Sequence, residues 1–171
     1  SNNTAVGRSA LSANTTGAHN TVVGALAGDA LTTASYNVVL GYEALTVDTK
    51  GANNVAIGSF ALRDQNFTSA TNAYNVAIGY EAGGSVTTGA NNTIIGGLAG
   101  DALTDSDRNV ALGYAALTNE TLGQYNTAVG YAALSTQNST SATNTLNTAV
   151  GYNAGALITT GAQNTALGAL S

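Results

Sequence analysis

Few side chains of this chain could act as catalysts or bind a metal ion. His19 is the one histidine, and the absence of cysteine removes thiolate chemistry, disulfides and zinc clusters together. Asp105 and Asp107 form an Asp-x-Asp pattern, but calcium binding needs further ligands that the pattern does not supply. Asp29 and Asp101 occupy equivalent places after Ala-Gly, which favours a structural turn over a general acid. We therefore expect no enzyme activity, no metal site and no cofactor.

Charged residues are equally sparse. They make up 8% of the chain, whose net charge is −5, whereas about 25% is typical of soluble domains. The four basic residues are scattered at Arg8, Lys50, Arg63 and Arg108. Because phosphate binding needs clustered Lys and Arg, we expect no nucleic-acid partner. No stretch approaches 18 consecutive apolar residues, so we expect no membrane insertion either.

The elements that position all these side chains are set by a repeat. A five-residue phrase reads Asn, then Thr or Val, then a small or branched apolar residue, then Val, Ile or Leu, then Gly. Its ten copies begin at Asn3, Asn20, Asn37, Asn54, Asn75, Asn92, Asn109, Asn126, Asn147 and Asn164, and they end at Gly7, Gly24, Gly41, Gly58, Gly79, Gly96, Gly113, Gly130, Gly151 and Gly168. The copies are 17 residues apart, except for 21 residues after Asn54 and Asn126, so a super-repeat of 72 residues matches 3–74 to 75–146. Such periodicity predicts one solenoid domain over 1–171, as a segment of a longer fibre.

Each phrase is rich in branched residues and ends at Gly, which predicts a strand of about five residues. Side chains alternate faces in a strand. In the first copy, Thr4 and Val6 then point one way, while Asn3, Ala5 and Gly7 point the other way. Both faces are mostly apolar or small, as is typical of a strand that is covered on both faces. The rest of the coil can cover one face, and the other cover must come from elsewhere.

The rest of the coil predicts a thin return. Ala followed by Leu or Gly stands three residues after the phrase, as in Ala44-Leu45 and Ala82-Gly83, and we expect a second short strand there. A polar stretch follows whose regular position is Thr, at Thr15, Thr32, Thr49, Thr87, Thr104, Thr121 and Thr159. Glycines then turn the chain towards the next Asn, and we expect them to adopt positive φ: Gly17, Gly51, Gly89, Gly123 and Gly161.

The columns of identical residues have structural interpretations beside sharper ones. The ten Asn, stacked at about 4.8 Å, would hydrogen-bond amide to amide along the axis; metal or ligand binding is the alternative. The Thr column favours a turn device, with ice binding as the alternative. Tyr follows the phrase Gly in five coils, at Tyr42, Tyr80, Tyr114, Tyr131 and Tyr152. Packing with a hydrated hydroxyl is expected for these rings, rather than sugar recognition.

Both 21-residue coils carry their four extra residues at the same place, between the Ala-Leu step and the next Asn. Both stretches contain Ser-Ala-Thr-Asn, at 69–72 and 141–144. Surface loops tolerate insertion and often carry function. We therefore expect these loops outside the roll, where they adjust its twist or contact a neighbouring fibre or a surface glycan. The candidate contact residues are Phe67, Ser69, Asn72, Ser141 and Asn144.

The phrase Asn75-Val76-Ala77-Ile78-Gly79 resembles the head repeats of YadA-like trimeric autotransporter adhesins. Asn126 to Leu134, Asn-Thr-Ala-Val-Gly-Tyr-Ala-Ala-Leu, resembles the longer repeats of phage tail fibres and related surface fibres. The resemblance covers the whole chain. It implies a left-handed parallel β-roll, three chains side by side with the phrase strands along the trimer axis, and an extracellular, cell-surface or virion location. Adhesin heads resemble coils of about 14 residues, so the longer coil leaves the outer-strand register open.

The expected fold is accordingly an all-β, left-handed parallel β-roll or β-solenoid of ten 17- or 21-residue coils in a homotrimer. A single-chain β-helix is the alternative, but Val6 to Ala10 fits a hexapeptide unit only once per coil. The expected function is a structural shaft or head segment of a trimeric fibre. The alternatives are an adhesive module that binds a receptor or glycan, and, further off, an ice-binding solenoid.

Overall fold

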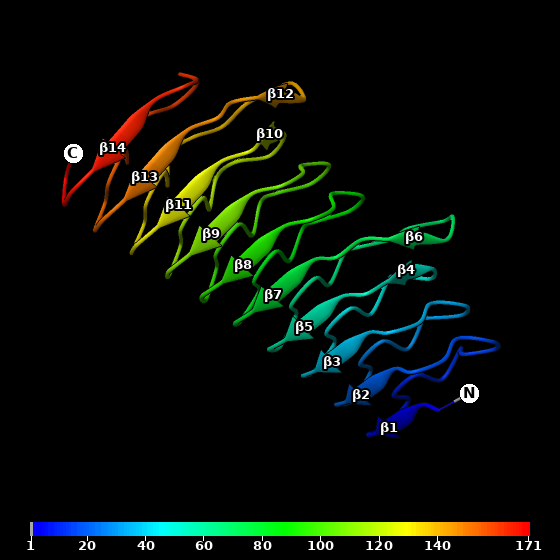
Figure 1. The fold of residues 1–171 in the computed structure, drawn as a ribbon. Helices are drawn as coiled ribbons and strands as arrows, with labels where there is room; N and C mark the ends of the chain where they lie inside the picture. Colours follow the sequence, from blue (N-terminus) through cyan, green and yellow to red (C-terminus); the bar gives the residue numbers. More distant parts are fainter. Residues whose placement is uncertain (1) are drawn as a thin grey trace.

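In the computed structural model, which describes residues 2–171, the chain forms one parallel β-solenoid of ten coils (Figure 1). Each phrase supplies one strand of a ten-stranded parallel sheet, in the order β1-β2-β3-β5-β7-β8-β9-β11-β13-β14. These strands are β1 (Thr4–Val6), β2 (Thr21–Val23), β3 (Val38–Leu40), β5 (Val55–Ile57), β7 (Val76–Ile78), β8 (Thr93–Ile95), β9 (Val110–Leu112), β11 (Thr127–Val129), β13 (Thr148–Val150) and β14 (Thr165–Leu167). The expected all-β solenoid and its repeat are confirmed.

Equivalent residues of successive phrases lie side by side in the sheet. Val55 pairs with Val76 and Ile57 with Ile78, so the register is unchanged across the first 21-residue coil. The second long coil preserves it as well, since Thr127 pairs with Thr148. The extra residues are therefore absorbed outside the sheet, and every column of identical residues runs unbroken from the first coil to the last.

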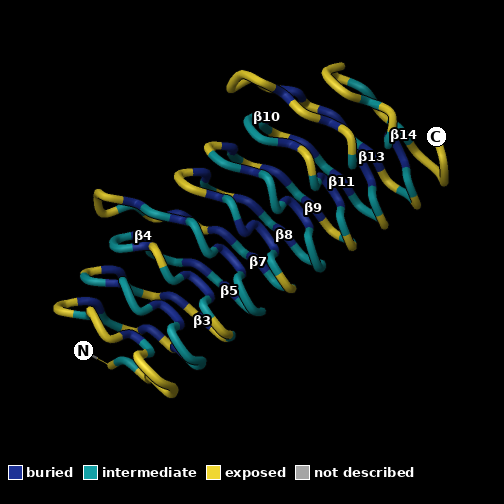
Figure 2. The backbone as a smooth tube through the Cα atoms, turned by 180° about the vertical axis from the view of Figure 1, so that it is seen from behind, coloured by how far each residue is buried: buried dark blue, intermediate teal, exposed yellow. Residues whose placement is uncertain are grey.

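The middle residue of each strand points into the coil. Val22, Val39, Ala56 and Ile94 are almost completely buried, whereas the residues on either side of them point outward. Figure 2 shows the buried segments as a continuous line inside the coils, with exposed segments at the tips. One face of the sheet is thus covered by its own coil, and the other is left to solvent in the single chain.

The return segment is not a strand, which corrects our expectation of a second one. After the phrase Gly, the chain makes tight turns in which the second and fourth residues adopt the left-handed conformation, as at Glu43 (φ 51°) and Leu45 (φ 49°). A strand needs extended residues at those places. The segment is held to its neighbours all the same, because Leu45 N donates to the Ala61 carbonyl at 3.0 Å, and Gly28 N donates to the Ala44 carbonyl at 2.9 Å.

The core holds one large apolar side chain per return segment, and this comes from one of two positions. In five coils it is the Leu four residues after the phrase Gly, as at Leu45 and Leu62, and a polar residue stands three positions later. In four coils that Leu is replaced by Gly, as at Gly28, and the later position is apolar, as at Leu31. A Cβ on Gly28 would lie 2.9 Å from Leu31 Cδ1, so the Leu31 side chain fills the space that the missing side chain leaves.

The five turn glycines do not adopt positive φ, so our explanation for them is wrong. They are needed instead because another chain segment approaches too closely for any side chain. A Cβ on Gly161 would lie 2.9 Å from Asn164 Nδ2, and a Cβ on Gly51 would lie 2.9 Å from the Phe67 ring and would clash with the Asp48 carboxylate. Close approach of the backbone is the second common reason for glycine.

The long coils form two small parallel sheets beside the main one. β4 (Gly51–Ala52) pairs with β6 (Thr71–Asn72), and β10 (Gly123–Gln124) pairs with β12 (Thr143–Asn144). The loops that lead into β6 and β12 project from the solenoid at its turn edge (Figure 1). Thr68, Ser69 and Ala70 are exposed at the first of these tips.

Candidate interaction surface

The outward face of the ten-stranded sheet carries a continuous row of apolar side chains. It is formed by the last residue of each strand, here called the apolar row: Val6, Val23, Leu40, Ile57, Ile78, Ile95, Leu112, Val129, Val150 and Leu167. Leu40 is 46% exposed and Leu112 41% exposed, although both lie in the interior of the coil stack. The outward residue at the start of each strand is Thr or Val, so the strands present no charged side chain on this face. Soluble monomers rarely expose contiguous apolar patches of this kind, which mark interaction sites.

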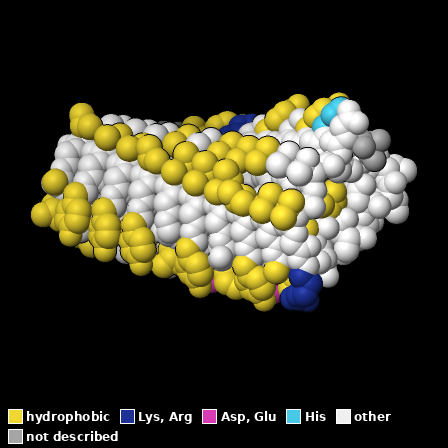
Figure 3. Space-filling view, turned by 90° about the horizontal axis from the view of Figure 1, so that it is seen from below, with side chains coloured by type: hydrophobic (Ala, Val, Ile, Leu, Met, Phe, Trp, Pro, Cys, Tyr) yellow, Lys and Arg dark blue, Asp and Glu magenta, His cyan; other side chains and the backbone are white. Residues whose placement is uncertain are grey.

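A flat band of backbone follows the apolar row. The phrase glycines form it, with φ between 114° and 144°. A Cβ on Gly79 would lie 2.5 Å from the Gly96 carbonyl oxygen of the next coil, so side chains are excluded from this column by both conformation and space. Figure 3 shows the band as a pale strip between two rows of hydrophobic side chains.

The second hydrophobic row contains the tyrosines that follow the phrase Gly. Tyr114, Tyr131 and Tyr152 belong to three successive coils, and their rings stack on one another, with centroids 5.5 and 5.4 Å apart. In the first super-repeat, Phe60 lies between Tyr42 and Tyr80 and meets both rings edge to face. A stacked ring presents its edge and hydroxyl to solvent, while its face is covered by the next ring.

Charged neighbours accompany only the first aromatic group. Glu43 raises the pKa of the Tyr42 phenol, first through a side-chain hydrogen bond and then through its negative charge, and Glu81 raises the pKa of Tyr80 in the same way. Arg63 forms a two-pronged hydrogen bond with Asp64, which raises the pKa of the guanidinium. The same guanidinium lies 5.8 Å from the centroid of the Phe60 ring. The two super-repeats thus present different chemistry on an otherwise equivalent edge.

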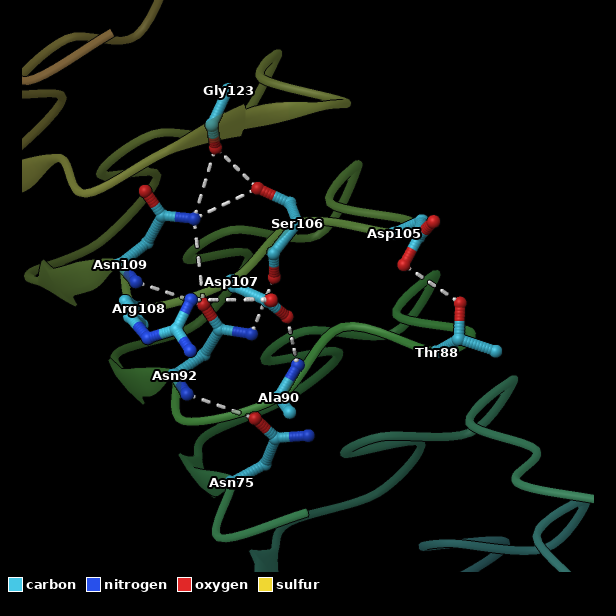
Figure 4. A network of polar contacts seen from close by, with 10 residues as sticks. All are labelled: Asn75, Thr88, Ala90, Asn92, Asp105, Ser106, Asp107, Arg108, Asn109 and Gly123. Atoms are coloured by element: carbon cyan, nitrogen blue, oxygen red, sulfur yellow. Dashed lines mark hydrogen bonds and ion pairs between the residues drawn. The ribbon is translucent and has the colours of Figure 1, made fainter. Parts of the chain in front are cut away.

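The asparagine column is a structural ladder, but its main bonds differ from those we expected. Each Asn side-chain oxygen accepts a hydrogen bond from the backbone N–H of the next Asn, in nine bonds of 2.8 to 3.1 Å. In seven coils the amide nitrogen donates to a carbonyl of its own turn, as Asn92 does to Ser106 (Figure 4). Amide-to-amide bonds occur at four steps only, because the backbone partners are nearer.

The residues weighed for catalysis or metal binding are not brought together. Asp105 accepts the Thr88 hydroxyl at 2.9 Å, while Asp107 accepts the Ala90 N–H at 2.7 Å and lies 3.5 Å from Arg108 (Figure 4). Asp29 and Asp101 each accept a Thr hydroxyl of the next coil at 2.6 Å. His19 is exposed, and its ring stacks on Tyr36 at 5.0 Å. Within residues 2–171, no three His, Asp or Glu side chains gather as metal ligands.

The threonine column is tied into the coil stack. The hydroxyls of Thr15, Thr32 and Thr104 each donate to the carbonyl of the next threonine, at 3.0 to 3.1 Å. At Thr49 and Thr121 the acceptors belong to the long coils. These hydroxyls serve the turn, and their donor capacity is already used.

Two buried carboxylates are functional residues of the fold that sequence reasoning missed. Asp48 accepts hydrogen bonds from Lys50 N, Gly51 N and Phe67 N at 2.9 to 3.2 Å, and from Gln65 Nε2 at 2.6 Å. Its side chain has no exposed surface. Glu120, 72 residues later, does the same with the backbone N–H groups of 121, 122, 123 and 139 and with Gln137 Nε2. Both carboxylates anchor the turn of a short coil to the loop of the following long coil.

The candidate contact residues of the long coils separate into two groups. Ser69, Asn72, Ser141 and Asn144 are exposed. Phe67 is not available for a surface contact, because its ring folds inward over Gly51 and is only 7% exposed. Its counterpart Ser139 is also buried, and its hydroxyl donates to Glu120 at 3.2 Å. The larger ring is thus paired with the shorter carboxylate, and the smaller hydroxyl with the longer one.

None of the described residues belongs to a helix of the length and apolar character that crossing a membrane requires. Comparison with protein-family models, curated proteins and solved structures gives no match. A functional assignment for this chain therefore depends on the chemistry of its own surfaces, of which the apolar row is the most extensive.

Proposed function

We propose that this chain is a structural shaft or head segment of a homotrimeric fibre on a cell surface or virion. The observation that carries the proposal is the apolar row, which is exposed along the outward face of the sheet although every other face of the coil is satisfied internally. The resemblance of the repeats to trimeric adhesin heads and tail fibres supports the order of the assembly, its location and a left-handed roll.

The periodicity of the row favours a second copy of the same chain as the occupant. The apolar side chains recur once per coil, at the interstrand spacing of about 4.8 Å. A partner that contacts all of them must present its own side chains at that spacing over ten coils. Another copy of this solenoid does so, and ordinary globular surfaces do not. The Gly band beside the row supplies a trough of matching period, so that ridge and trough can meet between neighbouring copies. Such a contact joins two different surfaces, as a closed threefold ring requires.

The test is the molar mass of the 171-residue chain in solution, measured by light scattering after size exclusion. Three copies of the 16.8 kDa chain should give about 50 kDa. Replacing Leu40 with Lys puts a charge into the apolar row and should yield folded monomer. Ala56 is unsuitable for this purpose, because it is buried inside its own coil.

Val47→Lys is the matched control. Val47 lies in the return segment of the same coil, away from the sheet, and is 40% exposed against 46% for Leu40. The same apolar-to-charged change should leave the trimer intact there. A monomeric parent chain, or equal loss of assembly in both variants, would refute the proposal.

An adhesive role is the second candidate, and the two projecting loops favour it. Ser69 and Asn72 repeat as Ser141 and Asn144 in the other super-repeat, and all four are exposed. Binding of the chain to a glycan array, lost when Ser69 and Ser141 are both replaced by bulky residues, would support this role. The ladder bonds of the threonine hydroxyls count against ice binding.

A further inference from the structure

Tyr114, Tyr131 and Tyr152 form a short stack along the edge of the solenoid. The ring centroids are 5.5 and 5.4 Å apart, and the ring planes are inclined by only 17° and 16°. Each side chain is half exposed, at 50%, 50% and 54%. Exposed rings change rotamer within nanoseconds or faster. The phenol edges of successive coils therefore meet repeatedly while the backbone holds them next to each other.

The composition of the chain directs one-electron oxidation to these phenols. It contains eight Tyr and no Cys, Met or Trp. Those three residue types are the usual competitors for an oxidising equivalent, and none is present to quench a tyrosyl radical. A radical formed on one phenol of the stack has a second phenol at contact distance, so that coupling is intramolecular and is favoured by proximity.

We propose that Tyr131 is a site of oxidative cross-linking, which joins it to Tyr114 or Tyr152 as dityrosine when a one-electron oxidant of the peroxidase class acts on the protein. Each of the two phenols gives one electron to the oxidant and releases its hydroxyl proton. The two phenoxyl radicals then form a carbon–carbon bond between ring carbons next to the hydroxyls. Both rings regain aromaticity when the hydrogens on those carbons move to the oxygens, so that the product has lost two hydrogen atoms. Peroxide, reduced to water, is the final electron acceptor.

The other five tyrosines provide internal controls within the described residues. Tyr42 and Tyr80 are separated by Phe60, which meets them at 88° and 86° and cannot form a phenoxyl radical. Tyr36 stacks on His19, and Tyr125 lies beside the Arg108 guanidinium. Tyr74 stands in the same column, with Asn53 and Asn91 in the coils on either side. Stacked tyrosine pairs occur only among 114, 131 and 152 in residues 2–171.

The experiment treats the intact chain with peroxidase and hydrogen peroxide, and follows dityrosine fluorescence and the cross-linked peptides by mass spectrometry. The expected product migrates as a single chain under denaturing conditions and contains Tyr131 linked to Tyr114 or Tyr152. Tyr131→Phe should reduce the yield to background. Tyr114→Phe and Tyr152→Phe should each leave one of the two links, and Tyr42→Phe should change nothing. Because each link joins two neighbouring coils, the oxidised chain should also melt at a higher temperature.

Two results would overturn the assignment. The first is a product in which the links join different chains, or mainly contain Tyr42 or Tyr80. The second is an undiminished yield from Tyr131→Phe, provided that its circular dichroism matches that of the parent. Since every link expected here lies within one chain, its formation does not depend on the trimer proposed above.

Discussion

Replacement of Asp48 by Asn changes two atoms at the centre of a buried chain of amides. The carboxylate accepts from the Gln65 amide, whose oxygen in turn accepts from Asn75 Nδ2 at 2.8 Å, and Asn75 also donates to the Gly89 carbonyl. Because a carboxylate only accepts, it fixes which way the Gln65 amide points, and Gln65 then fixes Asn75. An Asn at 48 places an NH₂ group against the Gln65 NH₂ group. Turning Gln65 over only moves the donor–donor contact to Asn75.

The cost follows from the bonds lost. Either orientation of Gln65 loses one buried, charge-assisted hydrogen bond and leaves a donor without a partner, which costs roughly 2 to 3 kcal/mol. The three backbone bonds to Asp48 persist, but they weaken when the acceptor becomes neutral. Relief from burying a charge offsets part of the loss. We expect a net destabilisation of about 2 kcal/mol, a large share of the 5–15 kcal/mol that is typical of a domain.

Urea unfolding followed by circular dichroism measures this, with Asp64→Asn as the matched control. Asp64 carries the same chemical change, but its partner is the half-exposed Arg63, and such surface pairs contribute about 1 kcal/mol or less. Hydrogen exchange should locate the defect, with faster exchange at the Gly51 and Phe67 amides. If Asp48→Asn unfolds at the same urea concentration as Asp64→Asn, the carboxylate does not set the polarity of the amides and the reasoning fails.

Two further substitutions test packing. Gly79→Ala should destabilise the chain by roughly 3 kcal/mol, because φ is +138° and the new Cβ would meet the Gly96 carbonyl, whereas Gly97→Ala meets only Tyr114 at 3.5 Å and should stay within about 0.5 kcal/mol in the same urea assay. Phe67→Ala should cost about 3 kcal/mol in thermal unfolding, since the ring is buried; Ser139→Ala should cost about 1 kcal/mol. Equal losses at the two positions would show that the Phe67 ring contributes no core packing.

The coils, the phrase strands and their inward and outward faces could be predicted from the sequence, because the same five-residue pattern is repeated ten times with its register. The left-handed return could not. Glu43 and Leu45 carry no sequence signal for positive φ, so Ala44-Leu45 resembled a strand. The buried carboxylates were missed for a related reason: a polar residue soon after a Leu looks like a solvated turn. The available signal was the alternation between Leu45 with Asp48 and Gly28 with Leu31, which shows that one position of each pair is in the core.

The left-handed residues also bear on how the solenoid is built. Every complete coil holds three of them, as at Glu43, Leu45 and Asn53, beside its phrase Gly. A bulky residue in this conformation costs of order 1 kcal/mol or more. The bonds that offset the cost run mostly to the coils on either side, so an isolated coil gains little from adopting its native shape. Order should therefore spread as in crystal growth, with a rare multi-coil nucleus and an advancing front that templates each new layer.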